Sequence, residues 1–309
     1  LVLPSNCGGG GTCGLCEVNL GPNAPLCDSD KRVLPADRRD AGARLSCQAR
    51  VASNMAVTVS RESLEAKRHR ATVTSSRCVT PFIREIKLQL ADPSFNYRAG
   101  SYIHAIIPPH RFTLEDLDVP YEFRRYWGGD AATLESDCRE EVRRAYSLAL
   151  PAAESQGTLV LNVRLMLPAE NVINAPAGAG SAWMWNLRPG DSVDFVGPLG
   201  EFHAESSEAD MIVIGGGAGM APLRAIIRDQ LLQSNSRRRI DFWYGARTKS
   251  DLFYADEMDE LQARFQNFRW QPVLSSPALS DEWSSAIGFV HAAAHEGLLK
   301  DRSDLEDCE

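Results

Sequence analysis

The chain has 309 residues, of which 44% are hydrophobic, and its 41 acidic and 33 basic side chains give a net charge of −8. This is an ordinary globular composition, and the length predicts two or three domains. No basic stripe with interleaved aromatic residues occurs, which argues against a nucleic-acid partner. No stretch reaches the roughly eighteen apolar residues that a membrane span needs.

Four cysteines near the start carry the strongest chemical signal. Cys7, Cys13 and Cys16 are spaced C-x5-C-x2-C, and Cys47 follows further along the chain. A plant-type [2Fe–2S] cluster takes three thiolates from one tight loop and the fourth from a distant strand. Glycines fill the space between Cys7 and Cys13, and a loop without Cβ atoms can aim several N–H groups at anionic sulfur. The pattern therefore predicts that these four cysteines ligate a [2Fe–2S] cluster.

Two other interpretations of these cysteines compete with the cluster. A structural zinc site usually has a second C-x2-C pair or histidines, and no histidine precedes His69. A disulfide framework is typical of short secreted chains, whereas this chain is long and its other cysteines are scattered. We take residues 1–60 as a ferredoxin-like domain that ends in an alternating strand at 55–59. Because such a fold needs a hairpin before its cluster loop, we expect an N-terminal piece outside this chain.

Residues 66–205 have the pattern of an antiparallel β-barrel. Short runs rich in Val, Ile and Leu recur between glycines and prolines, and several of them alternate with polar residues. The predicted strands are residues 69–74, 82–90, 101–107, 145–150, 158–165 and 192–196. A long insertion, residues 108–142, interrupts them, and a loop of this length is usually functional or packs on a partner.

Residues 207–309 change in character. An apolar run at 211–214 ends in glycines and is typical of a buried parallel strand. Predicted helices at 221–232 and 255–265 alternate with predicted strands at 240–244 and 269–274. This alternation predicts a doubly wound α/β domain.

The glycine run of this domain predicts a dinucleotide site. It comprises Gly215, Gly216, Gly217 and Gly219, and it lies between a strand and a helix whose first turn contains Pro222. Glycines let the backbone approach a pyrophosphate, and the helix N-terminus supplies N–H donors. The alternative is a tight turn without a ligand.

Arg247 follows the second strand of the same domain. Its guanidinium could contact the adenosine ribose or a 2′-phosphate, so the residues alone do not distinguish NADH from NADPH.

Two further motifs point to a flavin. Arg144 can pair with phosphate, Tyr146 offers a flat face to a flavin ring, and Ser147 can hydrogen-bond to a ring nitrogen. Gly178 and Ser181 precede a predicted helix at 182–187, which is a second candidate for pyrophosphate binding. Nicotinamide delivers two electrons as hydride and a [2Fe–2S] cluster takes one, so a flavin is needed between them. We predict that FAD binds here, with Tyr146 and Ser147 as the catalytic residues.

The motifs R-x-Y-S, G-x-x-S and G-G-G-x-G-x-A-P together resemble those of the ferredoxin–NADP⁺ reductase superfamily. The cysteine spacing and the long insertion resemble more closely the F subunits of sodium-translocating NADH:quinone reductases, and this resemblance covers essentially the whole chain. The other matching stretches are residues 118–120, 161–164, 197–202, 242–247 and 306–309.

The resemblance implies a multidomain fold: a partial β-grasp ferredoxin-like domain, an antiparallel β-barrel for FAD, and an α/β NADH domain that is incomplete at its C-terminus. It implies that electrons from NADH pass through FAD and the [2Fe–2S] cluster to membrane partner subunits and finally to quinone, while the partners export sodium. It also implies a place on the cytoplasmic face of the bacterial inner membrane, through an N-terminal helix outside this chain.

Two alternative functions stay open at this point. The first is a soluble NADH-dependent reductase component of a multicomponent oxygenase, which shares every cofactor and differs in its electron acceptor. The second is a non-catalytic zinc-binding scaffold.

Overall fold

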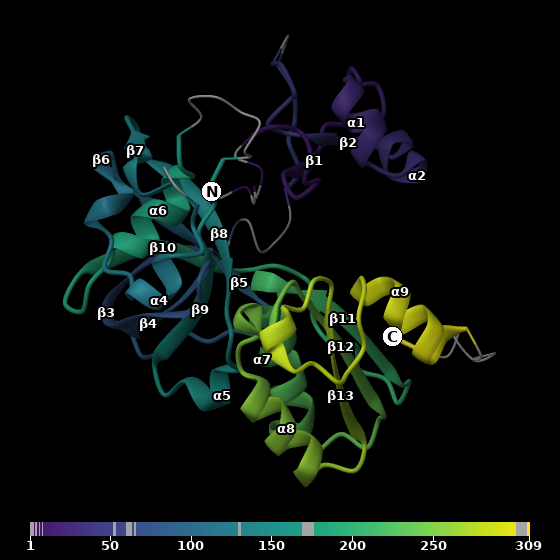
Figure 1. Ribbon diagram of the computed structural model, residues 1–309. Helices are drawn as coiled ribbons and strands as arrows, with labels where there is room; N and C mark the ends of the chain where they lie inside the picture. Colours follow the sequence, from purple (N-terminus) through teal and green to yellow (C-terminus); the bar gives the residue numbers. More distant parts are fainter. Residues whose placement is uncertain are drawn as a thin grey trace.

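The computed structural model describes residues 3, 5, 7, 9–51, 54–59, 64, 66–128, 131–168, 176–300 and 308–309. Three units succeed one another along the chain (Figure 1): an N-terminal unit, a β-barrel and an α/β unit. The predicted multidomain fold is therefore confirmed. Within the described ranges, no helix is both long and apolar enough to cross a bilayer.

The N-terminal unit pairs β1 (Glu17–Asn19) with β2 (Ala43–Leu45) in antiparallel fashion. Between them lie α1 (Asp28–Val33) and α2 (Ala36–Asp40). The Asp30 carboxylate accepts the N–H groups of Cys27 and Leu45, both at 2.8 Å, and so fastens the start of α1 to β2.

The predicted strand at residues 55–59 is wrong. Only Thr58 makes a ladder contact, an antiparallel bridge to Asn19. Val57 is 52% exposed, so the apolar side chains of this segment do not cover a core that would hold a longer strand.

Six antiparallel strands form the barrel, in the sheet order β8-β5-β10-β3-β4-β9. Their bounds are β3 (Lys67–Thr80), β4 (Ile83–Leu90), β5 (Tyr102–Ile107), β8 (Val142–Ser147), β9 (Thr158–Arg164) and β10 (Ser192–Leu199). The two end strands meet where Leu148 bridges Leu161 and the Ala149 N–H donates to Val160 at 2.8 Å, which closes the barrel. Alternate residues such as Ile86, Ile103 and Phe195 fill its interior.

Two short helices accompany the barrel: α5 (Ala152–Ser155) and α6 (Ala179–Asn186). Trp185 of α6 is fully buried in the barrel core, and its indole N–H donates to the Val163 carbonyl at 2.8 Å. This contact fixes α6 across one end of the barrel.

The strand that carries the R-x-Y-S motif begins and ends earlier than predicted. We expected residues 145–150, whereas β8 runs from Val142 to Ser147, because that stretch is the one that pairs with β5. Residues 148–150 instead carry the chain across to β9.

The insertion is a packed element rather than a free loop. It contains the antiparallel pair β6 (His110–Thr113) and β7 (Glu135–Cys138), with α4 (Tyr121–Arg124) between them. The buried guanidinium of Arg84 donates to the carbonyls of Trp185, at 2.7 Å, and of Asp118. The Trp127 indole donates to the Pro81 carbonyl at 2.8 Å. These bonds tie the insertion to the barrel.

The α/β unit has a parallel sheet in the order β11 (Met211–Gly216), β12 (Ile240–Ala246) and β13 (Phe268–Leu274). Helices α7 (Met220–Arg228) and α8 (Ala255–Arg264) cover one face, and α9 (Val290–Ala294) covers the other (Figure 1). Phe242 and Tyr244 pack on the α7–α8 side, whereas Trp243 packs with Ala294 of α9. This alternation is expected of a strand that is buried on both faces.

Gly100, just before β5, allows the chain to pass close to the backbone of Phe202. Its φ is +95°, and a Cβ there would lie 1.8 Å from the Phe202 carbonyl oxygen. Gly190 has a similar φ of +98°, but open space surrounds its Cβ position.

We expect Gly190→Ala to lower the free energy of unfolding by about 1–2 kcal/mol, which is the cost of the left-handed backbone alone. Gly100→Ala should cost about 1–3 kcal/mol more, because backbone atoms must also move. Guanidinium unfolding midpoints of the two variants measure the difference. Equal losses would show that the Phe202 contact is unimportant.

Candidate flavin, nucleotide and cluster sites

A cavity of about 300 Å³ gathers most of the predicted flavin residues. Its walls include Arg144, Tyr146, Gly178 and Ser181, together with Arg164 and Met166. β8 pairs with β5 along one edge, and the cavity lies along its other edge, between β8, the end of β9 and the start of α6. The first N–H groups of a helix have no partners inside that helix, so α6 offers donors to an anionic group here.

A close contact between α6 and β8 shapes this cavity. A Cβ on Gly180 would lie 2.5 Å from Cγ of Arg144, so only glycine lets the helix start lie against the arginine stem. The Ser181 hydroxyl donates to the Gly178 carbonyl and accepts the Met166 N–H, both at 3.0 Å. Ser181 therefore fixes the loop before the helix in addition to lining the cavity.

The two predicted catalytic residues of β8 differ in their placement. Tyr146 lines the cavity, and burial raises the pKa of its phenol well above the ordinary value, so the ring stays neutral. Ser147, the last residue of β8, pairs with Tyr102 of β5 and is absent from the described walls of the cavity.

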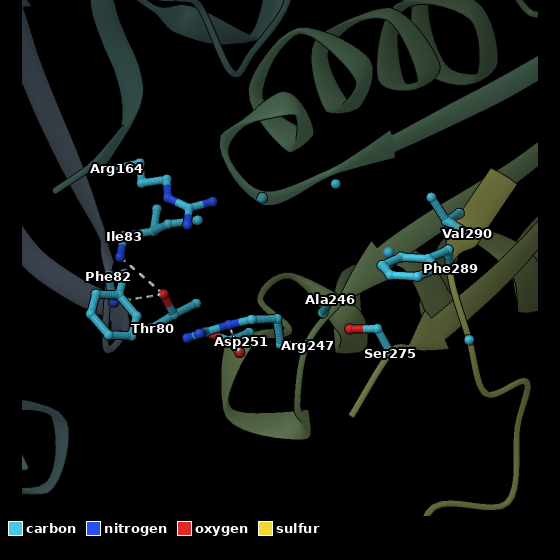
Figure 2. A pocket seen from close by; sticks show the side chains of 14 residues that line it. Thr80, Phe82, Ile83, Arg164, Ala246, Arg247, Asp251, Ser275, Phe289 and Val290 are labelled. Carbon is cyan, nitrogen blue, oxygen red and sulfur yellow. Dashed lines mark hydrogen bonds and ion pairs between the residues drawn. The ribbon is translucent and has the colours of Figure 1, made fainter. Parts of the chain in front are cut away.

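A second cavity, of about 260 Å³, lies where the barrel meets the α/β unit (Figure 2). The predicted residues Gly216, Gly217 and Arg247 line it. The barrel contributes Thr80, Phe82, Ile83 and Arg164, and the far side includes Ser275 and Phe289. The Tyr244 hydroxyl donates to the Gly217 carbonyl at 2.9 Å and holds the glycine loop in place.

The structure does not bring the remaining predicted glycine-loop residues to the described walls of this cavity. A Cβ on Gly215 would lie 2.3 Å from Cδ1 of Leu223, so Gly215 allows β11 to pack closely on α7. Gly219 lies just before α7, and no described residue beyond its own turn of helix comes within 4 Å of the position of a Cβ there. Pro222 is half-buried in the first turn of α7.

Arg247 extends from the end of β12 toward the barrel (Figure 2). Its guanidinium lies 5.3 Å from the centre of the Phe82 ring and 3.6 Å from the Asp251 carboxylate. Because 64% of the side chain is exposed, it can still reach a ligand in the cavity.

Arg164, at the end of β9, lines both cavities. The sequence placed it in a stretch that resembles the family but did not identify it as a site residue. One feature of the sequence could have identified it: Arg164 is the charged residue that ends a largely apolar strand.

The predicted cluster cysteines come together as two pairs. The sulfurs of Cys16 and Cys47 are 3.3 Å apart, and Cys13 lies close enough to Cys7 to lower the pKa of its thiol. In the parts of the chain that the structure describes, no three His, Cys, Asp or Glu side chains converge closely enough to hold a metal ion. The Gln48 amide donates to the Gly9 carbonyl at 2.7 Å and ties the cysteine loop to the Cys47 segment.

The surroundings of Cys7 favour its thiolate form, whereas those of Cys16 favour the thiol. Backbone N–H groups of Thr12 and Cys13 lower the pKa of Cys7 to about 5. Burial, together with the neighbouring Cys47, raises the pKa of Cys16 to about 11. Hydrogen bonds from N–H groups to the ligating sulfurs stabilise an iron–sulfur cluster, so these residues fit the cluster.

Three family models match the chain. They are the 2Fe-2S iron-sulfur cluster binding domain over residues 1–52, the oxidoreductase FAD-binding domain over residues 116–204 and the oxidoreductase NAD-binding domain over residues 213–308. With the fold and the two adjoining cavities, these matches define the class: a flavin-dependent oxidoreductase that uses FAD, NAD and a [2Fe–2S] cluster.

Curated relatives narrow this class. The F subunit of the Na(+)-translocating NADH-quinone reductase of Neisseria gonorrhoeae is 41% identical over all of this chain and 77% of its own length. The Shewanella denitrificans protein of the same name is 40% identical over all of this chain and 76% of its own length. The chain belongs to the family of Na(+)-translocating NADH-quinone reductase F subunits.

Solved structures show the same arrangement. The Amycolatopsis cytochrome P450 reductase GcoB has a TM-score of 0.67 and 26% identity, and covers 100% of this chain and 81% of its own. The ferredoxin reductase in carbazole 1,9a-dioxygenase has a TM-score of 0.62 at 21% identity, covers 99% of this chain and 79% of its own, and shares the fold.

We expect Arg144→Ala to raise the dissociation constant for FAD about 10- to 100-fold, which is the typical effect of losing a hydrogen bond to a charged group. Arg143→Ala is the matched control, since the neighbouring side chain points to the opposite face of β8. Fluorescence titration of the flavin-free protein measures both constants. Similar losses in the two variants would contradict the placement of FAD.

Proposed function

We propose that this chain is the electron-input subunit of a membrane NADH:quinone oxidoreductase coupled to sodium export. NADH is the hydride donor, and single electrons leave through the [2Fe–2S] cluster to partner subunits and finally to quinone. When bound, FAD supplies the step between two-electron and one-electron chemistry.

The observation that carries this proposal is the side chain shared by the two cavities. Arg164 lines the cavity with the flavin motif and the cavity with the glycine loop. Hydride transfer needs its two partners in near contact, at about 3–3.5 Å. A side chain common to both cavities puts the predicted FAD and NADH sites next to each other, which supports such a transfer.

The proposed roles result from this placement. Arg144, Gly178 and Ser181 would hold the FAD phosphates, while Tyr146 and Ser147 would face the ring. Gly216 and Gly217 would face the NADH pyrophosphate, with Gly215, Gly219 and Pro222 shaping the turn and Arg247 at the adenosine ribose. Cys7, Cys13, Cys16 and Cys47 would ligate the cluster.

We further propose domain limits of 1–60, 66–205 with the insertion 108–142, and 207–309, since the three units of the fold occur in that order. The names of the relatives support assembly with other subunits of a sodium-translocating reductase. A site of action on the cytoplasmic face of the bacterial inner membrane is part of the same proposal.

A second candidate is a soluble reductase that feeds an oxygenase. The fold shared with GcoB and with the carbazole dioxygenase reductase favours it. Sodium-stimulated quinone reduction by membranes, lost on deletion of the gene, would favour the first candidate. NADH-dependent reduction of a soluble oxygenase partner alone would favour the second.

The first test is the absorption spectrum of the anaerobic holoprotein before and after NADH. We expect flavin bands and a broad iron–sulfur absorbance, both of which bleach with NADH. Flavin without iron–sulfur absorbance, together with bound zinc, would overturn the cluster and the electron-transfer role. A colourless protein that binds zinc would leave only the scaffold interpretation.

Cys47→Ser separates the two electron carriers. We expect it to abolish the iron–sulfur absorbance and the reduction of one-electron acceptors, while NADH still bleaches the flavin. Cys27→Ser is the matched control, because Cys27 begins α1 as its N-cap and serine is a good N-cap residue. Iron analysis and stopped-flow spectra measure both variants, and loss of iron from Cys27→Ser would contradict the assignment.

A further inference from the structure

Polar side chains join the α/β unit to the barrel beside the nucleotide cavity. Arg224 of α7 donates to the Ala149 carbonyl of the barrel at 2.8 Å. Arg228, one turn further, pairs with Glu154 of α5, and both arginines pair with Glu257 of α8 at 2.7 Å. These contacts hold α7 and α8 against the barrel.

Tyr254, just before α8, makes a further contact with the barrel. Its hydroxyl donates to the Glu85 carboxylate of β4 and accepts the side-chain N–H of Asn162 in β9 at 2.9 Å. The Arg224 guanidinium lies 4.3 Å from the centre of the tyrosine ring. One side chain of the α/β unit is therefore held by two strands of the barrel.

The strand register places this contact next to the nucleotide cavity. Glu85 lies directly opposite Asn162, and two residues along the same pair of strands Ile83 lies opposite Arg164. Residues two apart on a strand share a face. Ile83 and Arg164 line the cavity, so the tyrosine hydroxyl binds the same barrel face that forms the cavity wall.

The backbone of Tyr254 is held in an unfavourable conformation. Its φ of 59° lies in the left-handed region, which side chains with a Cβ rarely adopt. Such residues persist where surrounding contacts over-determine them, and they concentrate at functional positions. The left-handed turn is what directs the ring from α8 into the barrel contact.

Near neutral pH, Glu85 stays ionised and Tyr254 stays protonated, so the hydrogen bond between them keeps one direction. Burial alone would raise the pKa of Glu85, but hydrogen bonds from Tyr254 and Arg77 outweigh burial and lower it. Burial and the nearby Glu85 raise the pKa of Tyr254. The carboxylate therefore accepts and the phenol donates.

We infer that Tyr254 is a positioning residue for hydride transfer. It locks the α/β unit onto the β4–β9 face, so that the glycine loop stands at a fixed distance from Arg164 and the flavin cavity. This inference rests on the proposed function, because it concerns the approach of NADH to FAD.

The test measures flavin reduction by NADH in the anaerobic holoprotein carrying Tyr254→Phe. The variant keeps the ring beneath Arg224 and removes both hydroxyl hydrogen bonds. We expect the limiting rate constant of flavin reduction to fall about tenfold or more, because small misplacements of reacting groups are costly. The NADH concentration at half-saturation should change little, since the cavity residues remain.

Tyr97→Phe is the matched control. Tyr97 is buried, and its hydroxyl donates to the Leu150 carbonyl within the barrel at 3.1 Å. It should reduce stability without slowing flavin reduction. Glu85→Gln keeps an oxygen that accepts the hydroxyl and should retain most of the rate, whereas Glu85→Ala should reproduce the slow reduction.

A second readout needs no turnover. Amide hydrogen exchange in residues 255–258 of the FAD-loaded protein should be about tenfold faster in Tyr254→Phe, because loss of the contact allows local opening, and unchanged in Tyr97→Phe. Wild-type rates in Tyr254→Phe, or unchanged exchange at the start of α8, would overturn the positioning role alone. Failure of NADH to reduce the wild-type flavin would overturn the proposed function as well.

Discussion

The flavin cavity depends on how one barrel strand is paired. β8 pairs with β5 along one edge and reaches β9 only where Leu148 bridges Leu161, in the part of the chain that the structure describes. Before that bridge, the edge that carries Arg144 and Tyr146 faces the cavity instead of another strand. An unpaired edge exposes backbone groups that require partners. A ligand in this cavity can supply partners for the unpaired edge of β8, so the edge that forms the binding site is also the one that needs a ligand.

The end of β9 connects the flavin cavity to the nucleotide cavity. Once β9 separates from β8, its last residue, Arg164, stands between two cavities. Arginine suits this place because its planar guanidinium is always charged and presents several donors. One residue can thus contact ligands on both sides.

Buried charges then fix how the two units meet. Glu85 and Arg224 are both nearly inaccessible to water, and each has a partner across this junction, the Tyr254 hydroxyl and the Ala149 carbonyl respectively. Burying a charge is unfavourable unless its hydrogen bonds are replaced, so an arrangement that leaves one unpaired is strongly disfavoured. These contacts select one placement of the α/β unit more than they add stability. Hydride transfer demands that kind of selection, since its rate depends on short distances.

Features that depend on local pattern could be predicted from the sequence, and those that depend on long-range contacts could not. Alternating strands and the strand–glycine–helix pattern identified the barrel and the α/β unit. The limits of β8 were wrong because pairing with β5, and not hydrophobicity, sets them. The glycine run was found as a motif, yet only the packing on Leu223 shows that Gly215 serves the helix–strand contact. Tyr254 carried no motif, and Arg164 lay in a matching stretch without an assigned role, because the roles of both come from register across strands distant in sequence.

In the cysteine loop, too, the sequence pattern predicted the residues, whereas the contacts between them are known only from the structure. Spacing predicted four ligands, while the fold supplies two cysteine pairs and the Gln48–Gly9 bond that joins their segments. Gly11 has a φ of +67°, and its Cβ position lies 2.7 Å from the Ser29 hydroxyl, so the loop can lie against α1 only as glycine. Metal-ligand bonds contribute their free energy to folding when the protein holds the ligands nearby. The Gln48 bond and the close packing at Gly11 hold the cysteine loop beside the Cys47 segment, which explains why glycines and Gln48 accompany the four cysteines.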